Sequence, residues 1–166
     1  MSFWQPAYIG IGSNLQEPIE QVQRAIQSLA GLADCVGVIS SRLYRSLPMG
    51  PQDQPDFINA AVGLLTRQSP GALLRTLQGL EAKAGRDRSG ERWGPRVLDL
   101  DLLFMPGIRR TDESLTLPHA GMAARNFVLM PLCDICPNAT PFGSKTVRSL
   151  ANGAGSEGIE TLELGA

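Results

Sequence analysis

Strand and helix patterns alternate along the first 104 residues in the order strand, helix, strand, strand, helix, strand. Runs rich in β-branched residues predict the strands, and apolar residues at helical spacing predict the helices. The predicted strands cover residues 7–12, 36–45, 57–66 and 97–104, and the predicted helices cover residues 19–29 and 70–84. This order matches the split βαβ arrangement, in which helices cover one face of a mainly antiparallel sheet. We therefore predict an α+β fold whose other sheet face is left to long loops.

The second predicted helix has clear boundaries. Ser69 can cap its first turn, Pro70 suits the first helical position, and Gly85 ends the apolar stripe. Two long segments accompany these elements. Residues 46–56 are rich in Pro, Gly and Asp, and residues 86–96 are strongly charged. Residues 46–56 are too many for a plain hairpin turn, so we expect them to have a function of their own.

The composition is that of one ordinary globular domain over residues 1–166. The chain has 166 residues, 43% of them hydrophobic, and a formal net charge of −1. This charge argues against a general nucleic-acid binder, and no apolar run approaches the roughly 20 residues that cross a bilayer. The first residues also lack a signal-peptide pattern, so we expect a cytoplasmic protein without membrane partners. The glycine-rich segment 138–166 has no clear period, and we assign it little structure.

Asp99 and Asp101 are the most informative polar residues. In a strand, residues two apart point to the same face, so these carboxylates would lie together while Leu98, Leu100 and Leu102 fill the other face. Carboxylate oxygens completed by water and substrate phosphates form the kind of site that Mg²⁺ prefers. The alternative is a solvated sheet face that binds nothing.

Four arginines precede this strand within eleven residues: Arg86, Arg88, Arg92 and Arg96. Guanidinium groups bind phosphate oxygens through paired hydrogen bonds, so their position next to a carboxylate pair favours a phosphate-bearing ligand. The alternative is a solvated run of charges. His119, the single histidine, lies six residues before Arg125. With a phosphate site already inferred, a phosphate contact becomes its favoured role.

The usual nucleotide-binding motifs are absent from the sequence. It contains no G-x-x-x-x-G-K-[ST] motif, and Leu15 stands where a dinucleotide-binding fingerprint would place its third glycine. Cys133 and Cys136 have C-x-x-C spacing, which invites a redox or zinc interpretation. Because the chain has a single histidine, they are better explained as two small buried residues.

Residues 92–103, RWGPRVLDLDLL, resemble the signature of the 6-hydroxymethyl-7,8-dihydropterin pyrophosphokinase family. Further blocks resemble that family in the same order: residues 8–15, residues 50–62, and residues 117–119 with residues 125–127. Together they extend over roughly residues 7–135. The length and mixed composition of the signature argue against a chance match.

The resemblance implies a ferredoxin-like fold and an enzyme of folate biosynthesis. Such an enzyme transfers pyrophosphate from ATP to the hydroxymethyl group of the dihydropterin and releases AMP. Carried over by position, Asp99 and Asp101 would hold two Mg²⁺ ions that bridge the ATP phosphates. Charge that spreads over phosphate oxygens during transfer is stabilised by such ions and by guanidinium groups. We expect a monomer that acts on these small molecules and not on nucleic acid.

The resemblance assigns the other site residues to three groups. The residues expected at the reacting phosphates are Arg86, Arg92, Arg96 and His119. The residues on the nucleotide side are Gln78, Glu81, Leu102, Thr116 and Arg125. The residues expected around the pterin are Ser46, Met49, Phe57, Asn59, Trp93 and Phe127.

The residues expected around the pterin differ in the contact that each would make. Phe57 and Phe127 would stack on the flat ring, and Asn59 would both donate to and accept from its amide edge. Ser46 and Met49 would approach through their backbones. Trp93 would close over the site.

Three positions depart from the pattern common in the family: Ser89, Ser114 and Ala120. Each departure weakens an expected ATP contact. Two alternatives remain, the first motivated by these departures and the second by the carboxylate pair, which could serve with water as the nucleophile. One is a non-catalytic pterin- or nucleotide-binding module of the same fold. The other is a metal-dependent phosphohydrolase, for which the sequence supplies no obvious water-activating base.

Overall fold

The computed structural model describes residues 3–85 and 94–164. The longer elements are the strands β1 (Gln5–Ser13), β4 (Phe57–Thr66) and β5 (Asp99–Phe104) and the helices α1 (Pro18–Ala30), α2 (Pro70–Lys83) and α3 (Asn126–Ile135). The shorter elements are β2 (Cys35–Ser40), β3 (Tyr44–Ser46), β6 (Arg110–Thr111), β7 (Thr116–Leu117), the 3₁₀ helix η1 (Met122–Ala124), α4 (Val147–Ala154) and β8 (Ile159–Thr161). None of the described helices is long and apolar enough to cross a membrane.

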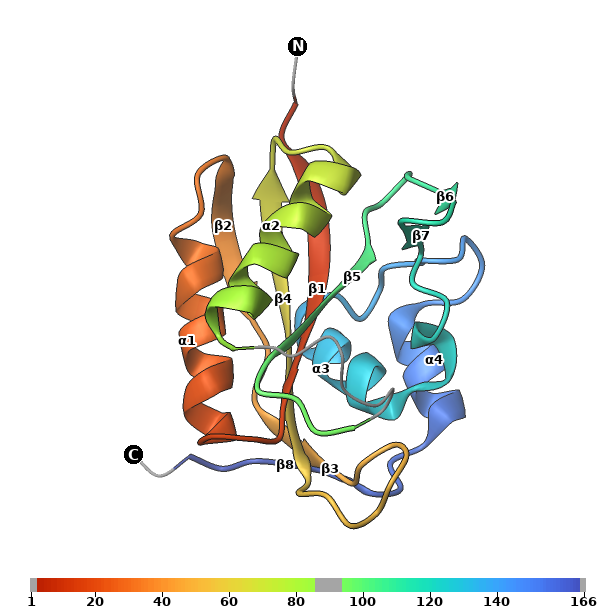
Figure 1. The fold of residues 1–166 in the computed structure, drawn as a ribbon. Helices are drawn as coiled ribbons and strands as arrows, with labels where there is room; N and C mark the ends of the chain where they lie inside the picture. Colours follow the sequence, from red (N-terminus) through yellow and green to blue (C-terminus); the bar gives the residue numbers. More distant parts are fainter. Residues whose placement is uncertain (1–2, 86–93, 165–166) are drawn as a thin grey trace.

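The main sheet is antiparallel and is built around β1 and β4 (Figure 1). β1 pairs with β5 along one edge and with β4 along the other. The far edge of β4 pairs with β2 near its end and with β3 near its beginning. β8 adds a last strand outside β3. The antiparallel sheet is therefore confirmed, and the predicted order of elements holds up to β5 except that the single strand predicted at 36–45 is divided into β2 and β3.

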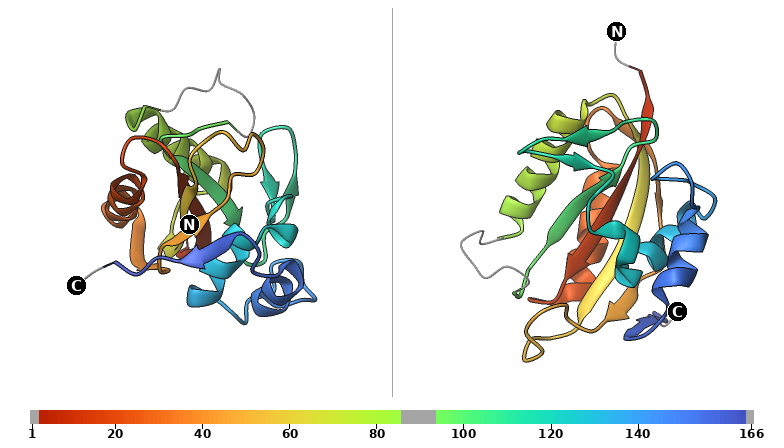
Figure 2. Two further views of the ribbon diagram at one scale, coloured as in Figure 1. Left: turned by 90° about the horizontal axis from the view of Figure 1, so that it is seen from below. Right: turned by 90° about the vertical axis from the view of Figure 1, so that its right-hand side faces the viewer.

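Apolar side chains alternate with other residues along the strands, and this alternation gives the sheet one apolar face. Ile9 of β1, Val62 of β4 and Leu100 of β5 belong to one buried cluster with Leu29 of α1 and Leu77 of α2. Full burial of an apolar side chain of this size contributes about 1.5 to 3 kcal/mol, so this cluster is the main core. Both helices lie on the same side of the sheet, as predicted (Figure 2).

The opposite face of the sheet is not left to loops alone. The apolar run at 127–135 forms α3, and Figure 2 shows α3 and α4 across the sheet from α1 and α2. Leu103 of β5, Leu132 of α3 and Val147 of α4 belong to a second buried cluster on this side. A cavity occupies another part of the same face, beside α3.

The predicted strand at 36–45 is two strands rather than one. Gly37 has a φ of +64°, and the register between β2 and β4 shifts after Val36. β2 ends at Ser40, and the hydroxyl of the next residue, Ser41, accepts a 2.8 Å hydrogen bond from the Ala61 N–H. This side-chain acceptor interrupts the regular ladder, which resumes in β3. The strand predicted at 97–104 is also shorter and begins at residue 99.

The prediction of little structure for residues 138–166 is wrong. Thr146 caps α4 by accepting a 3.1 Å hydrogen bond from the Ser149 N–H, and Val147 is fully buried. β8 pairs with β3, and the Leu47 N–H donates to the Gly158 carbonyl at 2.9 Å. A helix of 8 residues and a strand of 3 residues are too short to show a period among glycines.

Tyr44 connects β3 to α3 and offers a test of how this half of the molecule is held together. Its side chain is 1% exposed, and its hydroxyl lies 2.9 and 3.0 Å from the carboxylate oxygens of Asp134. Although burial raises the pKa of Asp134, hydrogen bonds from Arg42 and Tyr44 hold it below its ordinary value. We expect Tyr44→Phe to lower the free energy of unfolding by about 1 to 2 kcal/mol in urea titrations. Arg42→Ala removes an exposed partner of the same carboxylate and should cost less. An equal or larger loss for Arg42→Ala would contradict this ranking.

Candidate active site

Two glycines of β1 open a trough across the sheet face that carries the acidic pair. Gly10 lies opposite Asp101 of β5, and Gly12 lies between Asp99 of β5 and Asn59 of β4. A Cβ atom on Gly12 would lie 3.3 Å from the Oδ1 of Asn59. Because β1 carries no side chain at these positions, the side chains of β4 and β5 form two facing walls.

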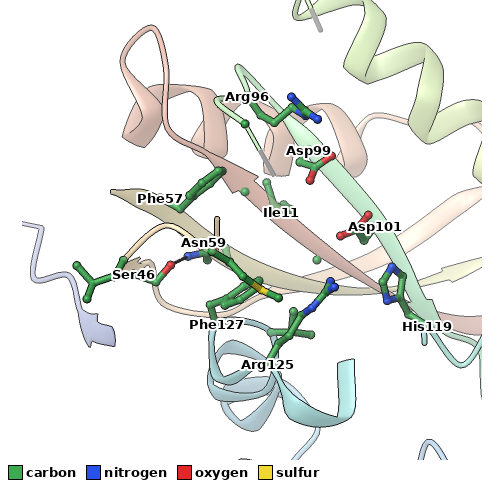
Figure 3. Close-up of a pocket in the computed structure, with 17 residues that line it drawn as sticks. Ile11, Ser46, Phe57, Asn59, Arg96, Asp99, Asp101, His119, Arg125 and Phe127 are labelled. Carbon is green, nitrogen blue, oxygen red and sulfur yellow. Dashed lines mark hydrogen bonds between the residues drawn. The ribbon is translucent and has the colours of Figure 1, made fainter. Parts of the chain in front are cut away.

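A cavity of about 320 Å³ occupies this trough (Figure 3). Its volume is within the range of small-molecule sites. The predicted site residues that line it are Ser46, Met49, Phe57, Asn59, Arg96, Asp99, Asp101, His119, Arg125 and Phe127. The fold therefore brings predicted pterin, phosphate and metal residues together in one place.

Asp99 and Asp101 line one wall of the cavity, whereas Leu100 between them is 4% exposed on the opposite face. The Leu100 N–H is satisfied by the buried Glu81 carboxylate at 3.1 Å, which attaches the edge strand β5 to α2. Within the described part of the chain, no group of three His, Cys, Asp or Glu side chains could hold a metal ion by itself. The two carboxylates fit Mg²⁺ as a partial set of hard oxygen ligands, which water and phosphate oxygens would complete.

Phe57, Asn59 and Phe127 line the cavity opposite the acidic pair, and Figure 3 shows the two rings on either side of Asn59. Asn59 is 4% exposed, and its Nδ2 donates a 2.7 Å hydrogen bond to the Ser46 hydroxyl. This bond fixes the amide so that its Oδ1 lies over Gly12 at the floor of the trough. An aromatic wall with an oriented amide is suited to a flat heterocycle with a polar edge.

Arg96 and Arg125 bring positive charge to the cavity from different segments. Figure 3 shows Arg96 next to Asp99, at the end of the cavity where the chain enters β5. Arg125 follows η1, and a Cβ atom on Gly121 would overlap its guanidinium group, so this glycine makes room for it. The cavity thus combines two carboxylates with two guanidinium groups, which is the charge pattern that a metal-bound phosphate requires.

His119 lines the cavity, and its surroundings favour the neutral imidazole by lowering its pKa. Its Nδ1 accepts a 3.1 Å hydrogen bond from the Gly121 N–H, so the ring proton is assigned to Nε2. Burial and the nearby Arg125 lower the pKa of the imidazole, and Asp99 opposes them only in part. If His119 contacts phosphate as predicted, a lowered pKa and a proton on Nε2 favour contact through a neutral N–H rather than through a positive charge.

We expect His119 to titrate below 6.5, the ordinary pKa of histidine. The chain has a single histidine, so an NMR titration of its imidazole signal is unambiguous. Between its lowered pKa and 6.5 the unfolded chain binds more protons, so the free energy of unfolding should rise with pH and level off above 6.5. His119→Asn should remove this pH dependence. A midpoint above 6.5 would refute the assignment.

Four predicted nucleotide-side residues lie outside the cavity. Gln78 and Glu81 are on α2, and Thr116 is on β7. Leu102 is 2% exposed in the main core, with its side chain on the face opposite the acidic pair. Glu81 is equally buried and contacts the β5 backbone.

Five of the positions named in the charged segment fall outside the described residues: Arg86, Arg88, Ser89, Arg92 and Trp93. Of the other departures from the family pattern, Ser114 donates to Asp112 at 2.7 Å, within the turn between β6 and β7. Ala120 is exposed. Neither of these two residues lines the cavity.

Seven cavity residues were not predicted: Gly10, Ile11, Gly12, Leu47, Ala60, Gly94 and Val128. Their small or apolar side chains carry no chemical signature. One signal was present, because Gly10 and Gly12 alternate with the apolar residues Ile9 and Ile11 and must share the face opposite to them.

Cys133 and Cys136 are free thiols. Burial raises the pKa of both, that of Cys136 to about 12. Thiols that stay protonated are poor nucleophiles and poor metal ligands. The structure therefore supports the interpretation of this C-x-x-C pair as packing residues.

Residues 8–137 match the family model described as 7,8-dihydro-6-hydroxymethylpterin-pyrophosphokinase. Two curated relatives named 2-amino-4-hydroxy-6-hydroxymethyldihydropteridine pyrophosphokinase are each 42% identical to the chain. The Haemophilus influenzae protein matches 87% of this chain and 89% of its own length. The Pseudomonas aeruginosa protein matches 95% of this chain and 97% of its own length.

Solved structures show the same fold at low identity. Wild-type Plasmodium falciparum HPPK-DHPS with pteroate has a TM-score of 0.72 at 14% identity, over 92% of this chain and 43% of that one. This chain thus spans less than half of the Plasmodium protein, and the likeness establishes the α+β fold alone. The family itself follows from the match over residues 8–137 and from the curated relatives. The chain belongs to the 7,8-dihydro-6-hydroxymethylpterin pyrophosphokinase family, the ATP-dependent enzymes that transfer pyrophosphate to a hydroxymethyldihydropterin in folate biosynthesis.

Proposed function

We propose that the cavity over β1 is the active site in which this chain transfers pyrophosphate from ATP to 6-hydroxymethyl-7,8-dihydropterin. One observation carries the proposal: an acidic pair on β5 faces an aromatic and amide wall across two glycines. The acidic wall suits a metal-bound polyphosphate, and the other wall suits a flat heterocycle. The reacting groups would meet between them.

The pterin would bind against β4 and α3. Phe57 and Phe127 would stack on its ring, and the Oδ1 and second amide hydrogen of Asn59 would pair with its polar edge. The Ser46 hydroxyl would hold the Asn59 amide in orientation, in addition to the backbone approach proposed for Ser46 and Met49. Trp93 would close over the ring.

The ATP phosphates would bind against β5. Asp99 and Asp101 would hold two Mg²⁺ ions, which when bound neutralise phosphate charge and orient the phosphate oxygens. The residues proposed to contact the nucleotide inside the cavity are Arg96 and Arg125, together with Arg86 and Arg92 of the charged segment. Gln78, Glu81, Leu102 and Thr116 would act only on a part of the nucleotide that extends beyond the cavity, and Leu102 only through its backbone, because its side chain is buried in the core. Arg96 and Arg125 line the cavity, and this supports their assignment to the phosphates.

In the proposed reaction, the pterin hydroxyl oxygen attacks the β-phosphorus of ATP in line with the departing AMP oxygen. A new oxygen–phosphorus bond forms, the bond between the β-phosphorus and the α-phosphate oxygen breaks, AMP leaves with that oxygen, and the hydroxyl proton is released to solvent. Arg96 and the Nε2–H of His119 would donate to the phosphate oxygens whose charge increases. Donors already fixed in place stabilise the transition state more than the bound substrates. The chain would act as a monomer in the cytoplasm. The monomer is supported by the described lining residues, all of which come from one chain.

Product analysis tests this function. Incubation with ATP, Mg²⁺ and the pterin should give AMP and the pterin diphosphate in equal amounts, and little AMP should form without the pterin. Free phosphate as the product would instead indicate a phosphohydrolase. Binding of both ligands without turnover would indicate a non-catalytic module.

A further inference from the structure

Asn14, the residue after β1, connects two segments that flank the cavity. Its side chain is 1% exposed. The Nδ2 donates to the Gln54 Oε1 at 3.0 Å and to the Pro55 carbonyl at 2.9 Å. The Oδ1 accepts from the Arg96 N–H at 2.8 Å, and the Asn14 backbone N–H donates to the Arg96 carbonyl at 3.0 Å. One buried amide thus joins Asn14 to Gln54, which is 40 positions away in the chain, and to Arg96, which is 82 positions away.

The Asn14 side chain does not line the cavity. Both of its amide hydrogens are used inside the protein, and its Oδ1 is turned to Arg96. A ligand in the cavity can therefore be affected by Asn14 only through the two segments to which the Asn14 side chain is hydrogen-bonded. This makes it a positioning residue.

Each of the two segments leads directly into one wall of the cavity. Pro55 is two residues before Phe57, on the side proposed for the pterin. Arg96 lines the cavity and is three residues before Asp99, on the side proposed for the phosphates. A planar amide that bonds to both backbones transmits a displacement of one segment to the other.

We propose that Asn14 couples nucleotide binding to pterin binding. A shift of the Arg96 backbone on binding of a phosphate ligand would move the Asn14 amide, and with it residues 54 and 55. Because equilibrium coupling is reciprocal, pterin binding favours nucleotide binding by the same factor. This inference rests on the proposed function, since it requires both ligands to bind in this cavity.

The test is the ratio of pterin dissociation constants without and with a saturating, non-hydrolysable ATP analogue and Mg²⁺, measured by isothermal titration calorimetry. We expect a ratio of about 10 for the wild-type chain. Asn14→Ala should bring it to within about twofold of one, because the amide that joins the segments is gone. Gln54→Ala removes one bond and should lower the ratio in part. It also serves as the test if Asn14→Ala does not fold.

Gln52→Ala is the matched control. The Gln52 side chain donates to the carbonyls of Pro48 and Gly50, so its bonds stay within the same segment. Its removal should leave the ratio unchanged. A merely structural role for Asn14 would weaken both affinities and leave the ratio as in the wild type.

Two outcomes would overturn the coupling while leaving the proposed function intact: a wild-type ratio near one, or an unchanged ratio in Asn14→Ala. Failure of the wild-type chain to bind either ligand would overturn the proposed function and this inference with it.

Discussion

Asp99→Asn and Asp101→Asn are each expected to lower kcat for pyrophosphate transfer by about 1,000-fold or more. Asparagine keeps the shape of the side chain but loses the negative charge that would hold Mg²⁺ against the phosphates. Both carboxylates line the cavity from the same strand. In each variant the new amide carries no charge, so it cannot replace the missing carboxylate. Single-turnover rates over a Mg²⁺ titration measure the effect.

The fold of these variants should be intact. Asparagine has the same shape as aspartate, and Asp99 and Asp101 are half-buried at the cavity rather than part of the core. We therefore expect little change in the Tm, as followed by circular dichroism. Asp34→Asn makes the same chemical change at an exposed residue outside the cavity and should leave kcat unchanged. A near-normal kcat for either cavity variant at saturating Mg²⁺ would show that the metal assignment is wrong.

Arg96→Ala should lower the single-turnover rate by about 100-fold or more while pterin affinity changes little. In the proposed reaction, the Arg96 guanidinium would bind more strongly as charge develops on the transferred group, whereas the pterin would lie against the opposite wall. The backbone N–H that binds Asn14 is retained in this variant. Arg96→Lys should restore the rate only in part, since an ammonium group lacks the planar fork of the guanidinium.

Asn59→Ala provides the opposite case. With the pterin bound as proposed, this variant would leave the polar edge of the pterin and the Ser46 hydroxyl without the Asn59 amide, which should cost about 1 to 3 kcal/mol of pterin affinity. Binding of an ATP analogue to the free enzyme should be nearly unchanged. Isothermal titration calorimetry of each ligand with each variant measures the two affinities separately. An Asn59 variant impaired mainly in nucleotide binding, or an Arg96 variant with normal chemistry, would refute this division of roles.

The elements that could be predicted are those whose pattern is complete within one segment. The alternation of Asp and Leu in β5 assigns its two faces wherever the strand lies, and the apolar stripe of α2 with its Ser69 cap defines that helix alone. α4 and β8 could not be predicted in this way. Their 8 and 3 residues are stabilised by contact with α3 and by pairing with β3, and neither contact leaves a local pattern.

The residue types of the site were also readable from the sequence, because carboxylates, guanidinium groups, an amide and aromatic rings each have a distinct chemistry. Their family resemblance indicated pyrophosphate transfer before any geometry was known. Whether they meet is decided by the register of β1 between β4 and β5, which places Gly12 between Asp99 and Asn59. No local pattern encodes that register, since it depends on strands from three separate segments.

The sequence by itself thus determined the strand faces, the two long helices and the chemistry of the site. Only the tertiary structure decided that the trough is open, that the Asn59 amide is oriented by Ser46 and that the pKa of His119 is lowered. The physical reason is the same in each case. Burial, hydrogen-bond geometry and pKa depend on neighbours that come from distant parts of the chain. Asn14 is an example, because its side chain bonds to Gln54, which is 40 positions away, and to Arg96, which is 82 positions away.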